Sequence, residues 1–304
     1  MPGAATQFVG GPRENAFNEA RAASSARQRP DRRAGEGGRS HATSGEDSVL
    51  TTDYVPGVPS WVDIGTPDTG RAAAFYTGLF GWEAVSAGPE AGGYGFFKQD
   101  GKTVAGYGPL MAEGARTAWM IYFQTAEADV TAKSVQQAGG TVSSAPMDVM
   151  AAGRMAQFSD PAGAPFAVWQ PGGTKGLDAV SDPGTFCWAE LHTADPGAAR
   201  SFYESVFGWH TEDMPMGDMT YTVISTSRPD SSFGGIVPLM GEPASHWQAY
   251  FEVPDCNATV AKAADLGGSV VSGPDDIPGV GRFAALTDPF GAAFSVITSA
   301  APAS

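Results

Sequence analysis

The chain has 304 residues and a formal net charge of −15, with 18 Lys and Arg against 33 Asp and Glu. This acidity opposes binding to nucleic acids and anionic membranes, so we expect neither as a partner. No apolar run approaches the roughly 18 residues of a membrane span, and no secretory leader is visible, so we expect a cytoplasmic protein.

Composition divides the chain into four parts. Residues 1–53 are rich in Arg, Gly and Ser and have no apolar periodicity, which predicts a disordered N-terminal tail. Residues 171–185 are rich in Gly and Pro, which predicts a linker. The remaining segments, 58–170 and 186–299, are each long enough for a domain.

The first domain opens with the short apolar strand "WVDIG" at Trp61, and a helix follows. Asp68 stands at the N-cap position of this helix, and Gly81 stands where it should end. Apolar residues recur between them with helical spacing at Ala72, Phe75, Tyr76 and Leu79.

The same pattern returns in the second domain. "AAAFYTGLFGW" begins at Ala72, and "ARSFYESVFGW" begins 127 positions later at Ala199. Asp195 is the predicted cap of the second copy, and Gly208 is its predicted end. A repeat of this length predicts two domains with one fold.

Each domain also reads as a double unit. Strand-like segments at 118–125 and 246–253 are each followed by a second helical segment, which ends at Gly139 in the first domain and at Gly267 in the second. Short strands rich in aromatic and β-branched residues follow every helix. The sequence therefore predicts a βαβββ unit four times over.

This order resembles the vicinal oxygen chelate superfamily, which contains glyoxalase I, extradiol dioxygenases and bleomycin-resistance proteins. The "FY…FGW" segments carry the resemblance together with the "DPAG" turn from Asp160 and the "DPFG" turn from Asp288. The resemblance is strongest to tandem two-domain proteins of actinobacteria. The resemblance implies an α+β fold of two glyoxalase-like domains, each a pair of βαβββ units. It also implies a mixed sheet that curls into a cup, with helices outside and a ligand inside.

The positions that bind metal in metal-using members of the superfamily carry unsuitable residues here. The resemblance places them at Trp61, Met120 and Ala167 in the first domain and at Trp188, Gln248 and Ser295 in the second. A divalent metal needs nitrogen or oxygen ligands, usually including a carboxylate, and of these residues only Gln248 could serve. We therefore expect no metal and no other cofactor.

Strand alternation predicts which side chains face each cup. The expected ligand-binding residues are Trp61, Asp63, Met120, Tyr122, Trp169, Trp188, Gln248 and Tyr250. Each cup would then hold Trp, Tyr and one carboxylate, which suits a flat and partly polar molecule, although the aromatic rings could also simply fill the cup. The carboxylates could instead bind backbone groups or the turn arginines Arg154 and Arg282.

Glu190 and His192 lie two apart on one strand, so they share a face and could act as a catalytic acid–base pair or form a solvated pair. Met214, Met216 and Met219 are expected in a loop, where they would cover an apolar ligand or pack locally. Three functions therefore remain open. They are metal-free binding of an aromatic or polyketide-like molecule in self-resistance or biosynthesis, metal-independent acid–base catalysis on such a substrate, and metal-dependent lyase or dioxygenase chemistry. The chain would be a monomer or a homodimer.

Overall fold

The computed structural model describes residues 50–110, 114–216, 219–226, 231–239, 244–277 and 280–300. Most of the expected N-terminal tail lies outside these ranges, and only its residues 50–53 are described. Leu50 is buried, and its carbonyl accepts a hydrogen bond of 2.9 Å from the Ser181 hydroxyl. Within the described ranges, every helix is too short or too polar to cross a membrane.

The first domain joins two βαβββ units in one eight-stranded sheet with the order β2-β3-β4-β1-β5-β8-β7-β6. Its central strands β1 and β5 are antiparallel, while β1 pairs with β4 and β5 pairs with β8 in parallel. The elements are β1 (Pro59–Thr66), α2 (Thr69–Phe80), β2 (Glu83–Ser86), a 3₁₀ turn (Pro89–Ala91), β3 (Gly95–Gln99), β4 (Lys102–Pro109), β5 (Ala118–Gln124), α3 (Ala128–Gln137), β6 (Thr141–Val149), β7 (Gly153–Ser159) and β8 (Pro165–Pro171).

The second domain repeats this topology with the order β10-β11-β12-β9-β13-β16-β15-β14. The four predicted units and the mixed sheets are therefore confirmed. The elements are β9 (Phe186–Thr193), α4 (Pro196–Phe207), β10 (His210–Met216), β11 (Met219–Ser225), β12 (Ser232–Pro238), β13 (His246–Glu252), α5 (Cys256–Asp265), β14 (Ser269–Ile277), β15 (Gly281–Thr287) and β16 (Ala293–Ser299).

Helices α2 and α4 begin and end where their caps predict. The Asp68 carboxylate accepts a hydrogen bond from the Arg71 N–H, and Asp195 accepts one from the Ala198 N–H, each at 2.9 Å. Both helices end on a glycine in the left-handed conformation, with φ of 77° at Gly81 and 69° at Gly208, where a side chain would cost energy.

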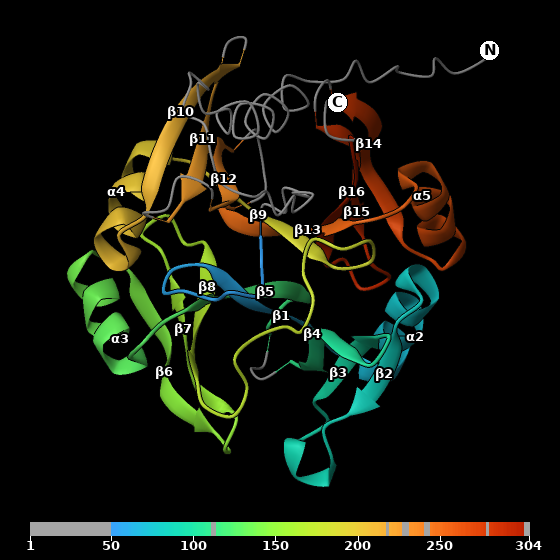
Figure 1. The fold of residues 1–304 in the computed structure, drawn as a ribbon, viewed down its shortest axis with the longest axis horizontal. Coiled ribbons are helices and arrows are strands. Elements are labelled where there is room, and N and C mark those ends of the chain that lie inside the picture. The colour runs from blue at the N-terminus through green and yellow to red at the C-terminus, as the bar shows by residue number, and fades with distance from the viewer. Residues whose placement is uncertain are drawn as a thin grey trace, which may run out of the picture.

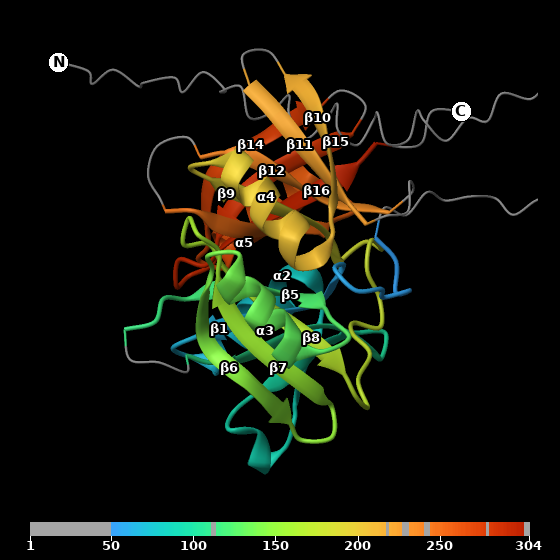
Figure 2. The same ribbon diagram turned by 90° about the vertical axis from the view of Figure 1, so that its left-hand side faces the viewer.

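The two domains meet through the faces of the sheets that carry the helices. In Figure 1 each sheet bends into an arch, and the central strands of the two arches lie next to each other in the middle of the molecule. Helix α2 packs on α5 and α3 packs on α4, so the second domain stacks above the first in Figure 2. We call the opposite face of each sheet, which carries no helix, its inner face.

The repeated "FY" segment supplies the contacts between the domains. The Tyr76 hydroxyl accepts a hydrogen bond from the Trp119 indole and donates one of 3.2 Å to Asp288 in the other domain. Tyr203 does the same in reverse, between Trp247 and Asp160, with a donated bond of 3.3 Å. One continuous apolar core crosses the boundary around these bonds.

The predicted linker is a packed segment of the first domain. The Leu177 N–H donates to the Ser60 carbonyl on β1 at 2.9 Å, and the Asp178 carboxylate accepts from the Thr103 N–H on β4 at 2.8 Å. Leu177 and Val180 are also buried. The segment between β8 and β9 is therefore held across the first sheet rather than serving as a free tether.

Candidate functional site

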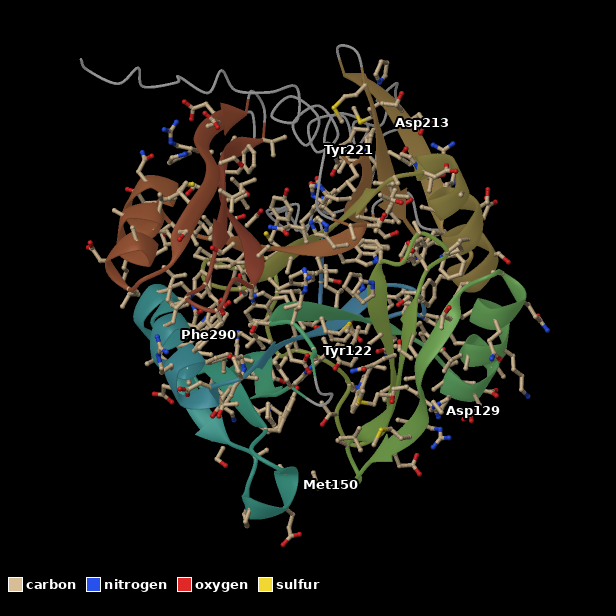
Figure 3. All side chains as sticks on the ribbon, turned by 180° about the vertical axis from the view of Figure 1, so that it is seen from behind. Tyr122, Asp129, Met150, Asp213, Tyr221 and Phe290 are labelled. Atoms are coloured by element: carbon tan, nitrogen blue, oxygen red, sulfur yellow. The ribbon has the colours of Figure 1, made fainter. Side chains whose placement is uncertain are left out.

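The central strands present matched side chains on the two inner faces. On β1, Asp63 lies opposite Met120 of β5, and Trp61 lies opposite Tyr122. On β9 of the second domain, Glu190 lies opposite Gln248 of β13, and Trp188 lies opposite Tyr250. Figure 3 marks the inner faces with Tyr122 in one domain and Tyr221 in the other.

On the first inner face, Asp63 is held by two phenol groups. Its Oδ2 accepts hydrogen bonds from the Tyr94 hydroxyl at 2.8 Å and the Tyr122 hydroxyl at 3.0 Å. The Tyr94 oxygen in turn accepts a bond of 3.0 Å from the Trp61 indole N–H. Indole, phenol and carboxylate thus form one hydrogen-bonded relay.

The second inner face contains the same relay with a longer acid. Glu190 Oε2 accepts from the Tyr221 hydroxyl at 3.1 Å, and Oε1 accepts from the Tyr250 hydroxyl at 2.9 Å. The Trp188 indole donates to Tyr221 at 3.1 Å. The proposed alternative that these acids bind the turn arginines is wrong, because Arg154 pairs with Asp129 and Asp148 and Arg282 pairs with Asp276.

Tyr94 and Tyr221 are members of the site that sequence reasoning missed. Tyr94 directly precedes β3 and Tyr221 lies on β11, and in each sheet one strand separates them from the strand of the acid. The available signal was their separation of 127 residues, the same as in the helical repeat. Their rings need glycine on the next strand, because a Cβ on Gly106 would overlap the Tyr94 hydroxyl and one on Gly235 would overlap the Tyr221 hydroxyl.

The pKa values of the two acids are shifted in opposite directions. Burial raises the pKa of the Asp63 carboxyl to about 6, and the hydrogen bonds from Tyr94 and Tyr122 oppose that rise only in part. Burial also raises the pKa of Glu190, but the nearby His192 and the two tyrosine hydroxyls outweigh it, so the net pKa is lowered. The first acid therefore takes up a proton at a higher pH than the second.

His192 gives the second inner face a group that the first lacks. Its Nε2 lies 2.9 Å from Glu190 Oε1, a close contact that is not aligned as a hydrogen bond. The imidazole also stacks on that of His246, with ring centres 4.9 Å apart and planes 7° apart. At the corresponding place in β1 the chain has Gly65.

The remaining predicted residues make no described hydrogen bond to Asp63 or Glu190. The Gln248 amide donates to the Ser295 hydroxyl at 3.1 Å, and the Trp169 indole donates to the Thr174 carbonyl of the packed segment at 2.9 Å. Met120 is half-buried on the first face. The loop prediction for the methionines is wrong, because Met214 and Met219 lie on the hairpin β10–β11, where both pack against the apolar cluster of the second inner face.

Comparison with known proteins identifies the family. The family model described as "Glyoxalase/Bleomycin resistance protein/Dioxygenase superfamily" matches residues 59–168 and again residues 185–296. The chain belongs to this superfamily. Both matches coincide with the two sheets, so the superfamily domain occurs twice.

Two proteins of Streptomyces are similar to the chain over most of its length. The chain is 44% identical over 263 residues to the anthracycline biosynthesis protein DnrV of Streptomyces peucetius, with 81% of this chain and 94% of that protein covered. It is 42% identical over 276 residues to the anthracycline biosynthesis protein DauV of Streptomyces sp. (strain C5), with the same shares covered. The Mn(II)-bound glyoxalase from Novosphingobium aromaticivorans shares the fold, with a TM-score of 0.58, 18% identity, 80% of this chain covered and 83% of that chain.

The metal ions of superfamily enzymes have no matching donor set here. Among the described residues, no three His, Cys, Asp or Glu side chains lie close enough to hold a metal ion. Trp61 and Trp188 stand at the expected first-ligand positions and use their N–H groups as donors to tyrosine. Gln248 donates to Ser295. These residues do not fit a resident metal.

Proposed function

We propose that this protein binds a planar aromatic natural product on an inner face and does so without a metal. The observation that carries the proposal is the buried relay of indole, phenol and carboxylate on each inner face. Aromatic walls around one fixed polar group are typical of sites for flat, partly polar molecules. The donor set at the superfamily's metal positions supports binding that needs no metal.

The relatives suggest where such a ligand belongs. Their printed names assign DnrV and DauV to anthracycline biosynthesis, and the identity to both exceeds 40% over most of either chain. We infer that this chain also acts in natural-product biosynthesis, as an accessory that holds an aromatic compound. Sequestration of that compound for self-resistance would use the same face.

Tryptophan fluorescence tests the binding proposal. Wild-type protein would be titrated with a panel of planar aromatic compounds, including anthraquinones, before and after treatment with EDTA. We expect saturable quenching that EDTA leaves unchanged, and loss of that quenching in Trp61→Phe or Trp188→Phe according to the face that binds. Absence of saturable quenching with every compound, or its loss after EDTA, would overturn the proposal.

Acid–base catalysis is the second candidate, because the Glu190 and His192 side chains approach within 2.9 Å. Such a pair can move a proton to or from a bound substrate. Replacing His192 by Ala separates the candidates. An enzyme would keep part of its binding and stop converting the compound, as followed by mass spectrometry, whereas a binding protein converts nothing in either form.

A further inference from the structure

His192 has polar atoms without a hydrogen-bond partner in the part of the chain that the structure describes. Both ring nitrogens are buried, and neither makes an aligned hydrogen bond. The rest of this network is bonded, since Glu190 accepts from Tyr221 and Tyr250. Buried polar atoms nearly always have partners, so an unsatisfied one at a candidate site points to a partner from outside the chain.

The position of the ring identifies which nitrogen is left over. Nε2 lies against Glu190 Oε1 at 2.9 Å, which favours the proton on that nitrogen. Stacking on His246 fixes the plane of the ring. Nδ1 is therefore the atom left to bond a ligand. It is buried in this structure, and the His192 side chain as a whole keeps 11% of its surface exposed.

The surroundings restrict the chemistry of that ligand. The apolar cluster of this inner face includes Trp188, Val223, Val237 and Phe283, which suits a largely apolar and flat molecule. Nδ1 accepts a hydrogen bond when the imidazole is neutral and donates one when it is charged. A hydroxyl group can do either, so it can bond to this atom in both states.

The first inner face lacks the same feature. Gly65 replaces the histidine there, so Asp63 has no imidazole beside it. The Trp169 N–H on that face is already bonded to the packed segment. The two inner faces therefore share the hydrogen-bonded indole, phenol and carboxylate, but only the second has an imidazole that could bind a polar group of a ligand.

We propose that each chain binds one ligand, on the inner face of the second domain, and that this ligand is a flat aromatic molecule whose hydroxyl group bonds to His192 Nδ1. The inference rests on the proposed function and narrows it to one domain and one chemical class. His192 is then the residue that selects for the hydroxyl group.

Isothermal titration calorimetry with a matched pair of probes tests this assignment on the full chain. The probes are 2,6-dihydroxyanthraquinone, whose hydroxyls lie too far from the quinone carbonyls to bond them, and its dimethyl ether, which has the same rings and no hydroxyl. We expect one site per chain and about tenfold tighter binding of the hydroxy probe, the usual effect of one hydrogen bond. In His192→Phe, which keeps a ring to stack on His246, the preference should vanish while the dimethyl ether binds as before.

Gly65→Ala is the matched control, because it alters the same position in the first domain and a Cβ there meets only ordinary contacts. It should leave both affinities unchanged. Retained binding of the dimethyl ether by His192→Phe reports that this variant is folded. Two sites per chain, or an undiminished preference in His192→Phe, would overturn the inference while leaving the proposed function intact. Failure of both probes to bind any form would overturn the inference, and the proposed function falls with it only when the whole aromatic panel also gives no saturable quenching.

Discussion

Replacing Asp63 by Asn should stabilise the protein at neutral pH and stabilise it less as the pH falls. Folding raises the pKa of this carboxyl from 3.8 to about 6. A group with a raised folded-state pKa contributes stability below its unfolded pKa and loses it as the pH rises through the folded value. At 1.36 kcal/mol per pKa unit, about two units amount to roughly 3 kcal/mol lost by neutral pH. The Asn side chain does not ionise, so the free energy of unfolding of the variant does not fall in this way.

Urea denaturation followed by tryptophan fluorescence measures the effect. The difference in free energy of unfolding between Asp63→Asn and wild type should grow by about 1.3 kcal/mol from pH 5 to pH 7. Glu190→Gln is the matched control with the opposite sign. The pKa of Glu190 is lowered, so its contribution is present above the unfolded pKa and lost as the pH falls. A pH-independent difference for Asp63→Asn, or slopes of one sign for both variants, would refute the reasoning.

Three further substitutions test the structural supports of the site and of the domain interface. Tyr76→Phe leaves the Asp288 carboxylate without its interdomain donor and should cost about 1–3 kcal/mol of unfolding free energy, measured with urea. Gly235→Ala forces the Tyr221 ring aside and should lower the melting temperature in thermal unfolding followed by circular dichroism, whereas an unchanged midpoint would contradict the close approach. Asp195→Ala removes the cap of α4 and should cost roughly 0.5–2 kcal/mol in the same urea assay.

The sequence predicts the helices well because their determinants are local. Asp68 and Gly81 lie within a few residues of the backbone groups that they satisfy, and the buried stripe follows from helical spacing alone. Strand alternation likewise places Trp61 and Asp63 on one face, because each residue reverses the direction of the side chain.

The partners of the two acids are harder to predict because they come from other strands. Tyr94 reaches Asp63 across the paired strands β3, β4 and β1, and no local pattern encodes that meeting. The stack of His246 on His192 depends on the register between β13 and β9. The role of Tyr76 depends on a bond to the other domain, which the helical pattern cannot distinguish from ordinary packing.

The two reciprocal tyrosine–aspartate hydrogen bonds between the domains explain how the sequences of the two domains could become different elsewhere. Tyr76 donates a hydrogen bond to Asp288, and Tyr203 donates one to Asp160. A change in either domain at this interface therefore affects a bond made by the other domain. On the inner faces the described bonds of Asp63 and Glu190 stay within their own domain, and there the halves differ, with Asp63 and Gly65 against Glu190 and His192. One half can thus serve as a fixed partner while the other acquires new chemistry. Substitutions on the first inner face could accordingly introduce binding of a second ligand without weakening the interface between the domains.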